Sequence, residues 1–158
     1  MCQDQLLKMI TNGEEIAING TDGTEGLAES TMFYIVDPDV VKWGLAVPAK
    51  LTKPTHVSVY ELVLDASLKE IFDSFSPKKL SDLCLTQAQI VEFVRKHGSW
   101  LRGEEKATFF LTESEGKFYA IHMLAYFPGD RIRVRVYSIY KPKGKWYAEN
   151  FHRVVVPI

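Results

Sequence analysis

Cysteine and long apolar runs are scarce in this chain. Its 158 residues include only Cys2 and Cys84, too few for a disulfide framework, and neither has the spacing of a metal ligand. No stretch reaches the roughly 18 consecutive apolar residues of a membrane span. The first residues lack the basic start and apolar run of a secretory signal. We therefore expect a soluble, cytoplasmic protein with free thiols and no membrane contact.

Motifs for cofactors and metals are also missing. The glycine-rich stretch 19–26 is not followed by the Gly-Lys-Ser/Thr of a phosphate loop, and its acidic residues lack the spacing of a calcium loop. The histidines His56, His97, His122 and His152 are scattered without a zinc-ligand pattern. The sequence therefore predicts no cofactor and no metal, and it predicts a flexible surface loop at 19–26.

Charge of either sign is nearly balanced overall, with a net of −1, but it is unevenly distributed. Residues 1–76 contain 5 Lys/Arg and 12 Asp/Glu, whereas residues 77–158 contain 14 Lys/Arg and 8 Asp/Glu. This asymmetry indicates either a basic working surface or two lobes that attract one another. Overall neutrality favours the second interpretation, because it weakens the long-range attraction for a polyanion.

The composition is that of an ordinary globular domain. Hydrophobic residues make up 46% of the chain and charged residues 25%, and a chain of this length can bury a sizeable core. No long linker interrupts it. We expect a single domain, 1–158, with an acidic mixed α/β sub-lobe at 1–76 and a basic sub-lobe at 77–158.

The first half shows short elements. The patterns predict, in chain order, a helix at Gln3–Ile10, strands at 16–18 and 31–36, a helical turn at 37–44, a strand at 56–64, a helix after Ser67 and another after Ser76-Pro77. Asp37 can cap its helical turn, with Pro38 at the first helical position. Ser67 and Glu70 have the spacing of a capping box.

The second half begins with the clearest helix signal. Thr86 and Gln89 form another capping box and Gly98 can end the helix, which predicts a helix at 87–97. After this helix, the spacing of the apolar residues changes from helical periodicity to alternation. This change predicts strands at about 106–112, 117–126, 131–140 and 145–155. We therefore predict an α+β fold, in which a mixed amino-terminal lobe precedes a capped helix and a four-stranded antiparallel β-meander.

Strict alternation marks the strand that begins at Arg131. One side carries Ile132, Val134 and Val136, and the other carries Arg131, Arg133, Arg135 and Tyr137. For the hairpin before it we predict the pairs Tyr126–Arg131, Leu124–Arg133 and His122–Arg135, because this register keeps the apolar side chains together. For the hairpin after it we predict the pairs Ile139–Tyr147, Tyr137–Glu149, Arg135–Phe151 and Arg133–Arg153.

These pairings predict a cationic and aromatic binding surface. Its members are Tyr126, Arg131, Arg133, Arg135, Tyr137, Tyr147, Phe151 and Arg153. Guanidinium groups bind phosphate and aromatic rings stack on bases, so such a face suits single-stranded nucleic acid. The same pattern also fits a solvated strand face, or a face covered by the acidic sub-lobe.

No catalytic spacing in the sequence is diagnostic. We therefore expect a small non-catalytic binding or interaction protein, whose partner is another protein or a second copy of the chain. The alternative is a nucleic-acid-binding or nuclease-like domain that uses the same face. In its catalytic form, His122 is the general acid or base, Glu149 is its partner, and Arg133 and Arg135 stabilise the charged transition state.

Overall fold

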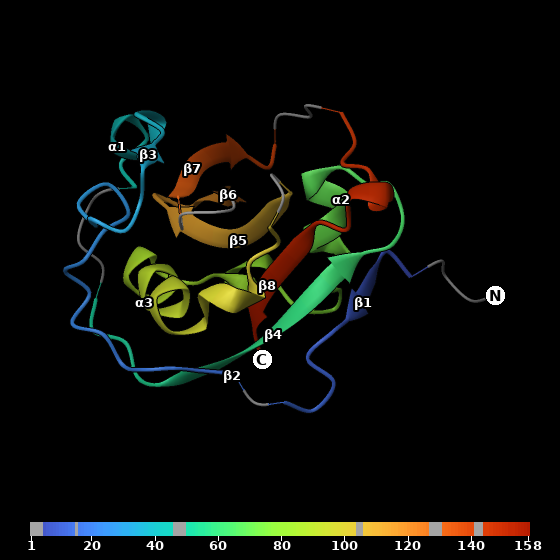
Figure 1. The fold of residues 1–158 in the computed structure, drawn as a ribbon, viewed down its shortest axis with the longest axis horizontal. Helices are drawn as coiled ribbons and strands as arrows, with labels where there is room; N and C mark the ends of the chain where they lie inside the picture. The colour runs from blue at the N-terminus through green and yellow to red at the C-terminus, as the bar shows by residue number, and fades with distance from the viewer. Residues whose placement is uncertain (1–4, 15, 46–49, 104–105, 127–130, 141–143) are drawn as a thin grey trace.

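In the described part of the chain, eight strands form one mixed sheet (Figure 1). The computed structural model describes residues 5–14, 16–45, 50–103, 106–126, 131–140 and 144–158. The strands are β1 (Leu7–Met9), β2 (Ile16–Ile18), β3 (Ile35–Val36), β4 (Thr55–Leu62), β5 (Ala107–Ser114), β6 (Lys117–Tyr126), β7 (Arg131–Ser138) and β8 (Arg153–Pro157). Their order is β1-β4-β8-β5-β6-β7-β3, and β2 pairs with β4 off this path. Strands from both halves of the sequence therefore share one sheet.

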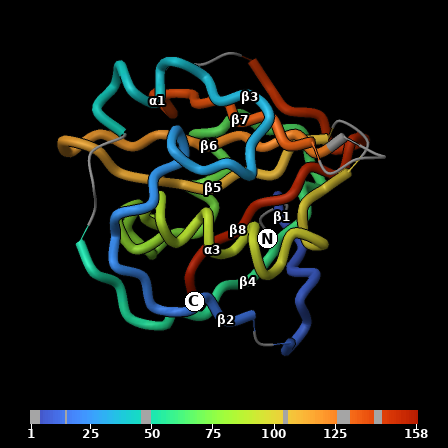
Figure 2. Tube along the Cα trace, turned by 60° about the vertical axis from the view of Figure 1, so that its left-hand side comes forward, coloured from blue at the N-terminus to red at the C-terminus, as the bar shows by residue number. Residues whose placement is uncertain are grey.

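Short helices complete this α+β fold. The α-helices are α1 (Asp39–Lys42), α2 (Leu68–Asp73) and α3 (Gln87–His97), and the 3₁₀ turns are η1 (Leu80–Leu83), η2 (Gly98–Trp100) and η3 (Ala148–Asn150). Two views place β3 and α1 beside β7 at one end of the sheet, with α3 near β5 (Figures 1 and 2). No helix among the described residues is both long and apolar enough to cross a membrane.

The sheet has a hydrophobic core on each face. Since successive strand residues point to opposite sides, Phe109 and Phe110 of β5 enter different cores, and both are fully buried. Phe110 packs against Phe93 of α3, with ring centroids 5.5 Å apart. Phe109 lies in the core that includes Ile71 and Phe72 of α2. A strand between two cores is buried on both sides, so its register is tightly specified.

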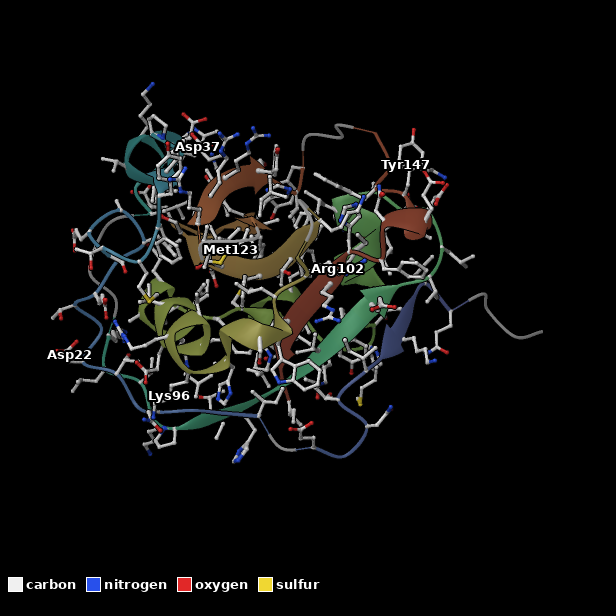
Figure 3. The ribbon with its side chains drawn as sticks, viewed as in Figure 1. Asp22, Asp37, Lys96, Arg102, Met123 and Tyr147 are labelled. Atoms are coloured by element: carbon white, nitrogen blue, oxygen red, sulfur yellow. The ribbon has the colours of Figure 1, made fainter. Side chains whose placement is uncertain are left out.

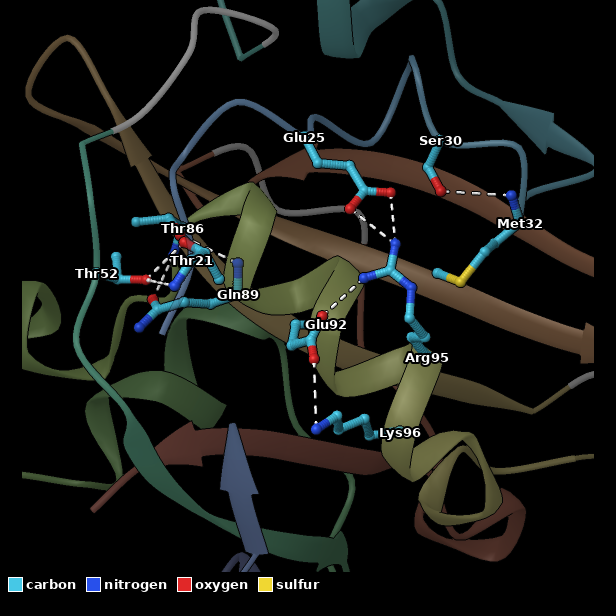
Figure 4. Close-up of polar contacts among 10 residues, drawn as sticks. All are labelled: Thr21, Glu25, Ser30, Met32, Thr52, Thr86, Gln89, Glu92, Arg95 and Lys96. Atoms are coloured by element: carbon cyan, nitrogen blue, oxygen red, sulfur yellow. Dashed lines mark hydrogen bonds and ion pairs between the residues drawn. The ribbon is translucent and has the colours of Figure 1, made fainter. Parts of the chain in front are cut away.

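Both predicted capping boxes are present. At α3 the Gln89 N–H donates to Thr86 Oγ1 (3.2 Å) and the Thr86 N–H donates to Gln89 Oε1 (2.9 Å) (Figure 4). Ser67 and Glu70 make the same two bonds at α2. Gly98 ends α3 in the right-handed helical region, so the chain continues directly into η2. The sequence signals therefore located the starts of these helices correctly.

Removing the cap of α3 is expected to destabilise the protein measurably. Thr86→Ala leaves the Gln89 N–H without its side-chain acceptor, which lowers the free energy of unfolding by about 1 kcal/mol. Urea unfolding followed by circular dichroism measures this loss. Thr31→Ala, at an exposed loop position, is the control and is expected to change stability by less than about 0.5 kcal/mol. Equal losses of unfolding free energy in both variants would contradict the assignment of Thr86 as the cap of α3.

The helix predicted at Gln3–Ile10 is wrong where the structure describes it. Residues 1–4 lie outside the described residues, and Leu7–Met9 form β1, which pairs antiparallel with β4. Leu7 is buried opposite Leu62, whereas Met9 is exposed. The edge of β4 offers backbone partners to these residues, and this tertiary pairing overrides a weak local helical pattern. The strand predicted at 31–36 is likewise reduced to β3, two residues parallel to β7.

The first hairpin of the predicted meander has the expected register. Across β6 and β7, Tyr126 lies opposite Arg131, Leu124 opposite Arg133 and His122 opposite Arg135. A slip of one position would expose the apolar residues of these strands. Their alternation was therefore sufficient to predict the register of this hairpin.

The prediction of the second hairpin is wrong. The meander therefore has three strands, β5, β6 and β7, and not four. After Ser138 the chain leaves the sheet, Trp146 makes a bridge to Ala66, and β8 inserts between β4 and β5, parallel to β5. The β7 pairings predicted for Tyr147, Glu149, Phe151 and Arg153 therefore do not form. The consecutive valines Val154–Val156 are all buried, as in a central strand covered on both faces.

Candidate binding surface and cavity along β7

The arginines of β7 differ in their surroundings. Arg131 and Arg135 are exposed, and Arg133 is half-buried. The Arg131 guanidinium lies 5.0 Å from the centroid of the Tyr34 ring, a cation–π contact with the segment before β3. Arg135 forms no ion pair with a carboxylate of the described residues. Arg135 is therefore an exposed guanidinium without an ion-paired carboxylate in the described part of the protein.

His122 is buried, although the sequence placed it on the open face. Its side chain is 3% exposed, and its ring lies 5.3 Å from Phe109, 5.5 Å from Tyr137 and 5.3 Å from Trp146. Its Nδ1 has no hydrogen-bond partner among the described residues. Burial, and then the positive charge of Arg135, lowers the pKa of His122 to about 4. At neutral pH this ring is uncharged.

A second buried histidine, His152, lies beside the first. The Ala107 N–H donates to its Nδ1 (2.9 Å), so the ring proton of the neutral form is on Nε2. Burial, and then the positive charge of Lys106, lowers the pKa of His152 to about 4. The Trp146 ring lies 5.4 Å from this ring as well. We call Phe109, His122, Tyr137, Trp146 and His152 the histidine–tryptophan cluster.

Sequence reasoning did not assign His152 and Trp146 to this cluster. The signal that could have found His152 is its alternation with Val154 and Val156 of β8, since His152 directly precedes that strand and lies two residues before Val154. Trp146 was expected to lie in a strand. It instead folds over the face of the sheet that carries His122.

Tyr147 and Phe151 remain exposed, at 57% and 49% of their surface. They flank η3, where the Phe151 N–H donates to the Ala148 carbonyl (2.9 Å) and Phe151 has φ 51° and ψ 45°. This left-handed conformation is uncommon for a bulky side chain. Asp65 Oδ1 accepts from the Ala148 N–H (2.8 Å), and Lys106 Nζ donates to Asn150 Oδ1 (3.0 Å). The turn is thus held while Tyr147 points outward (Figure 3).

The other predicted site residues are dispersed. Arg153 lies on the opposite face of the sheet, where it pairs with Thr108 across β5 and β8 and donates to the Trp100 carbonyl (2.9 Å). Glu149 is exposed in η3 and makes no hydrogen bond to His122 in the described part of the chain. The Tyr126 side chain falls outside what the structure describes.

The described residues of the acidic first half contact the basic second half through ion pairs and along the edge of β7. Glu25 pairs with Arg95 (2.6 Å; Figure 4) and Glu61 with Arg153 (3.8 Å), both away from that face. At β7 the amino-terminal segment runs along the strand edge, where the Asp37 N–H donates to the Val134 carbonyl (2.9 Å). Trp146, not the acidic half, covers His122.

A cavity of about 410 Å³ lies where this segment turns away from β7. Its lining comprises Asp37, Asp39, Trp43, Arg135, Val136, Tyr137 and Ser138, so it includes two predicted surface residues. A cavity of about 740 Å³ lies elsewhere, between the start of α3 and the tip of the β5–β6 hairpin. None of the predicted site residues lines that larger cavity.

Chemistry that needs a metal or a reactive thiol finds no support among the described residues. No group of three or more His, Cys, Asp or Glu side chains gathers there as metal ligands. Burial raises the pKa of the Cys84 thiol to about 12, and its Sγ lies 3.4 Å from the Leu80 carbonyl oxygen. This thiol stays protonated and is a poor nucleophile.

Comparison of the chain with protein-family models, with curated proteins and with solved structures finds no match. The features of this chain that can indicate a function are therefore the β7 face, the turn at η3 and the cavity at the strand edge.

Proposed function

We propose that this protein is a non-catalytic binding protein that recognises an acidic segment of a partner protein. The recognition surface consists of Arg131, Arg135, Tyr147 and Phe151, which we call the arginine–tyrosine surface. One observation carries the proposal: two large aromatic rings are held outward by a turn whose backbone is strained at Phe151. Backbone strain of this kind costs on the order of 1–3 kcal/mol and clusters at functional sites.

Aromatic and arginine side chains are the residues that most often carry binding energy at protein interfaces. Exposed rings bury a large area at a small cost in side-chain entropy, because each has only two rotatable bonds. The guanidinium of Arg135 has no carboxylate partner among the described residues. A partner with Asp or Glu side chains would supply one.

Apolar side chains beside the turn extend this surface. Val63 and Leu64 are each 38% exposed, and their segment runs alongside the turn through the two backbone hydrogen bonds between Ala66 and Trp146 (2.8 and 3.1 Å). We therefore expect the partner segment to carry apolar side chains as well as carboxylates.

The burial of His122 supports a binding function over the nuclease-like alternative. A general acid or base must reach the substrate proton, but this ring lies beneath Trp146 and is 3% exposed. Glu149 makes no hydrogen bond with it in the described residues. The exposed members of the face are suited to contact and charge pairing.

Peptide selection tests the proposal. Random dodecapeptides displayed on phage and selected on the purified protein are expected to be rich in Asp and Glu with interspersed apolar residues. Tyr147→Ser and Arg135→Gln should each weaken binding of the selected peptide by about tenfold or more. Leu51→Ser and Lys78→Gln, at exposed positions outside the surface, are the matched controls. Peptides without acidic enrichment, or binding that survives both surface substitutions, would reject the proposal.

The alternation of Arg131, Arg133 and Arg135 favours one competing function, binding of single-stranded nucleic acid. Fluorescence anisotropy with a labelled dodecamer of RNA or DNA, at salt concentrations between about 50 and 200 mM, separates the two. If the protein recognises an acidic protein segment, we expect no tight binding of the RNA or DNA dodecamer even at low salt. An affinity that falls steeply with salt, and disappears in Arg133→Ala and Arg135→Ala at unchanged melting temperature, would establish the competing function instead.

A further inference from the structure

The cavity at the β7 edge is lined by charged side chains of both signs, and these form no ion pair with one another in the described residues. Asp37 and Asp39 contribute to its wall, and so does Arg135. None of the ion pairs in the described part of the chain joins Arg135 to either carboxylate. The site therefore has an unpaired positive group and negative groups within one space of about 410 Å³.

The Asp37 carboxylate is fixed in position. Its Oδ1 accepts the Asp39 N–H (2.9 Å) and its Oδ2 lies 3.4 Å from the Val136 amide nitrogen, which donates to it. The Asp39 side chain is half-buried, and its carboxylate makes no hydrogen bond to a described residue. The two carboxylates line the same cavity, that of Asp37 fixed by two N–H groups and that of Asp39 without a hydrogen bond to a described residue. Both can accept hydrogen bonds from an ammonium group.

The edge of β7 adds a backbone hydrogen-bond donor and a backbone acceptor to the cavity. The pairing of β3 with β7 covers only Arg133 and Val134, and the Asp37 carboxylate takes the next N–H, that of Val136. Since alternate residues of a strand direct their backbone groups to the same edge, the Val136 carbonyl and the Ser138 N–H also face this edge. They offer an acceptor and a donor near the two charged side chains.

Fixed aromatic rings form the apolar part of the wall. The Trp43 ring stacks on Tyr119, with centroids 5.3 Å apart and planes at 27°. Tyr137 is packed edge-on against His122 (5.5 Å). A volume of about 410 Å³ is near the small end of the range for ligand pockets, roughly 300–1,000 Å³. The site is therefore scaled to a small molecule with an apolar portion.

We propose that this cavity binds a free α-amino acid with an apolar side chain. The ammonium group is placed against Asp37 and Asp39, the carboxylate against Arg135, and the side chain against Trp43. A simple cation would meet the like charge of Arg135 and a simple anion would meet two carboxylates, so the zwitterion is the ligand complementary to both. The cavity shares Arg135 with the arginine–tyrosine surface, but Asp39 and Trp43 lie outside that surface, so amino-acid binding can be tested separately from binding of a protein partner.

Isothermal titration calorimetry with L-phenylalanine, L-leucine and L-methionine tests this site. We expect at least one of them to bind. The N-acetyl derivative of that amino acid lacks the ammonium group and its amide lacks the carboxylate, and each should bind about tenfold more weakly or worse. Asp39→Asn and Arg135→Gln should cause similar losses for the parent amino acid, and Arg135→Lys should recover part of the affinity. Arg131→Gln, on the same face of β7 but outside the cavity lining, should stay within about twofold of the wild type.

Three results would overturn the proposal. The first is the absence of binding by all three amino acids at concentrations up to about 10 mM. The second is equal affinity for the parent, its N-acetyl derivative and its amide. The third is binding that Asp39→Asn and Arg135→Gln leave unchanged. Tyr147→Ser should leave amino-acid binding intact, so failure of the peptide experiment and failure of this one are distinguishable.

Discussion

Lowering the pH from 7 to 5 is expected to reduce the free energy of unfolding by about 2 kcal/mol for each of His122 and His152. Burial lowers the pKa of both rings from the ordinary 6.5 to about 4. Between these values the unfolded chain binds more protons than the folded protein, so stability falls as the pH falls. The contribution is complete above about pH 6.5 and is lost progressively toward pH 4.

Urea unfolding at pH 7, 6 and 5 measures this effect, because most carboxylates remain ionised over that range. His122→Phe removes one titrating ring and should lower the pH dependence by about half. The slope with pH is the readout, since any packing cost of the larger ring is the same at each pH. His56→Phe, at an exposed position, is the control for loss of a histidine. A wild-type midpoint that does not move between pH 7 and 5 would contradict the burial of both rings.

Phe109→Ala is expected to lower the free energy of unfolding by about 3–5 kcal/mol, which is the usual cost of truncating a buried phenylalanine. The Phe109 ring lies 4.8 Å from Trp146 and 5.3 Å from His122. Its loss leaves a cavity beneath Trp146 and lets water approach the buried histidines. The variant should therefore also lose part of the acid sensitivity described above, because better solvation raises the pKa of a buried histidine toward its ordinary value.

The neighbouring residue supplies a matched control. Phe110 is equally buried but faces the other core, where its ring contacts Phe93. Phe110→Ala should lose a similar amount of stability while leaving the pH dependence unchanged. Urea unfolding at pH 7 and 5 provides both readouts, and Phe109→Leu with Phe110→Leu serves if the alanine variants do not fold. The same pH dependence in both variants would show that Phe109 does not shield the histidines.

Local signals in the sequence were sufficient where a short segment determines its own structure. Thr86 with Gln89, and Ser67 with Glu70, located two helix starts because a capping box satisfies orphan N–H groups within one turn. The pairing of His122 with Arg135 followed from alternation across a single hairpin.

Distant pairing was not predictable by the same reasoning. The valines of β8 have no local feature that selects β4 and β5 over β7 as neighbours, and the assumption that consecutive strands pair led to the wrong hairpin. The short β1 has a local pattern that suits a helix, and only the edge of β4 makes it a strand.

The candidate site could also be predicted only where local sequence signals determine it. Arg135 and Tyr147 are exposed, and their assignment to a binding surface stays a prediction. The burial of His122 depends on Trp146, which lies in a segment that the sequence predicted to be a strand. The cavity was not predictable, because Asp37 reaches β7 only through the parallel pairing of β3. Sequence reasoning had assigned that residue only a capping role.

The position of β8 also determines which strand edges would be open if this strand were absent. This strand follows every other strand in the sequence, yet it is the one that joins β4 to β5. Without it, β1, β2 and β4 pair only with one another and β5, β6, β7 and β3 only with one another, so the edges of β4 and β5 that face β8 have no partner. Such edges are prone to pair with other chains. Val154–Val156 therefore protect the edges of two strands at once when they close the sheet.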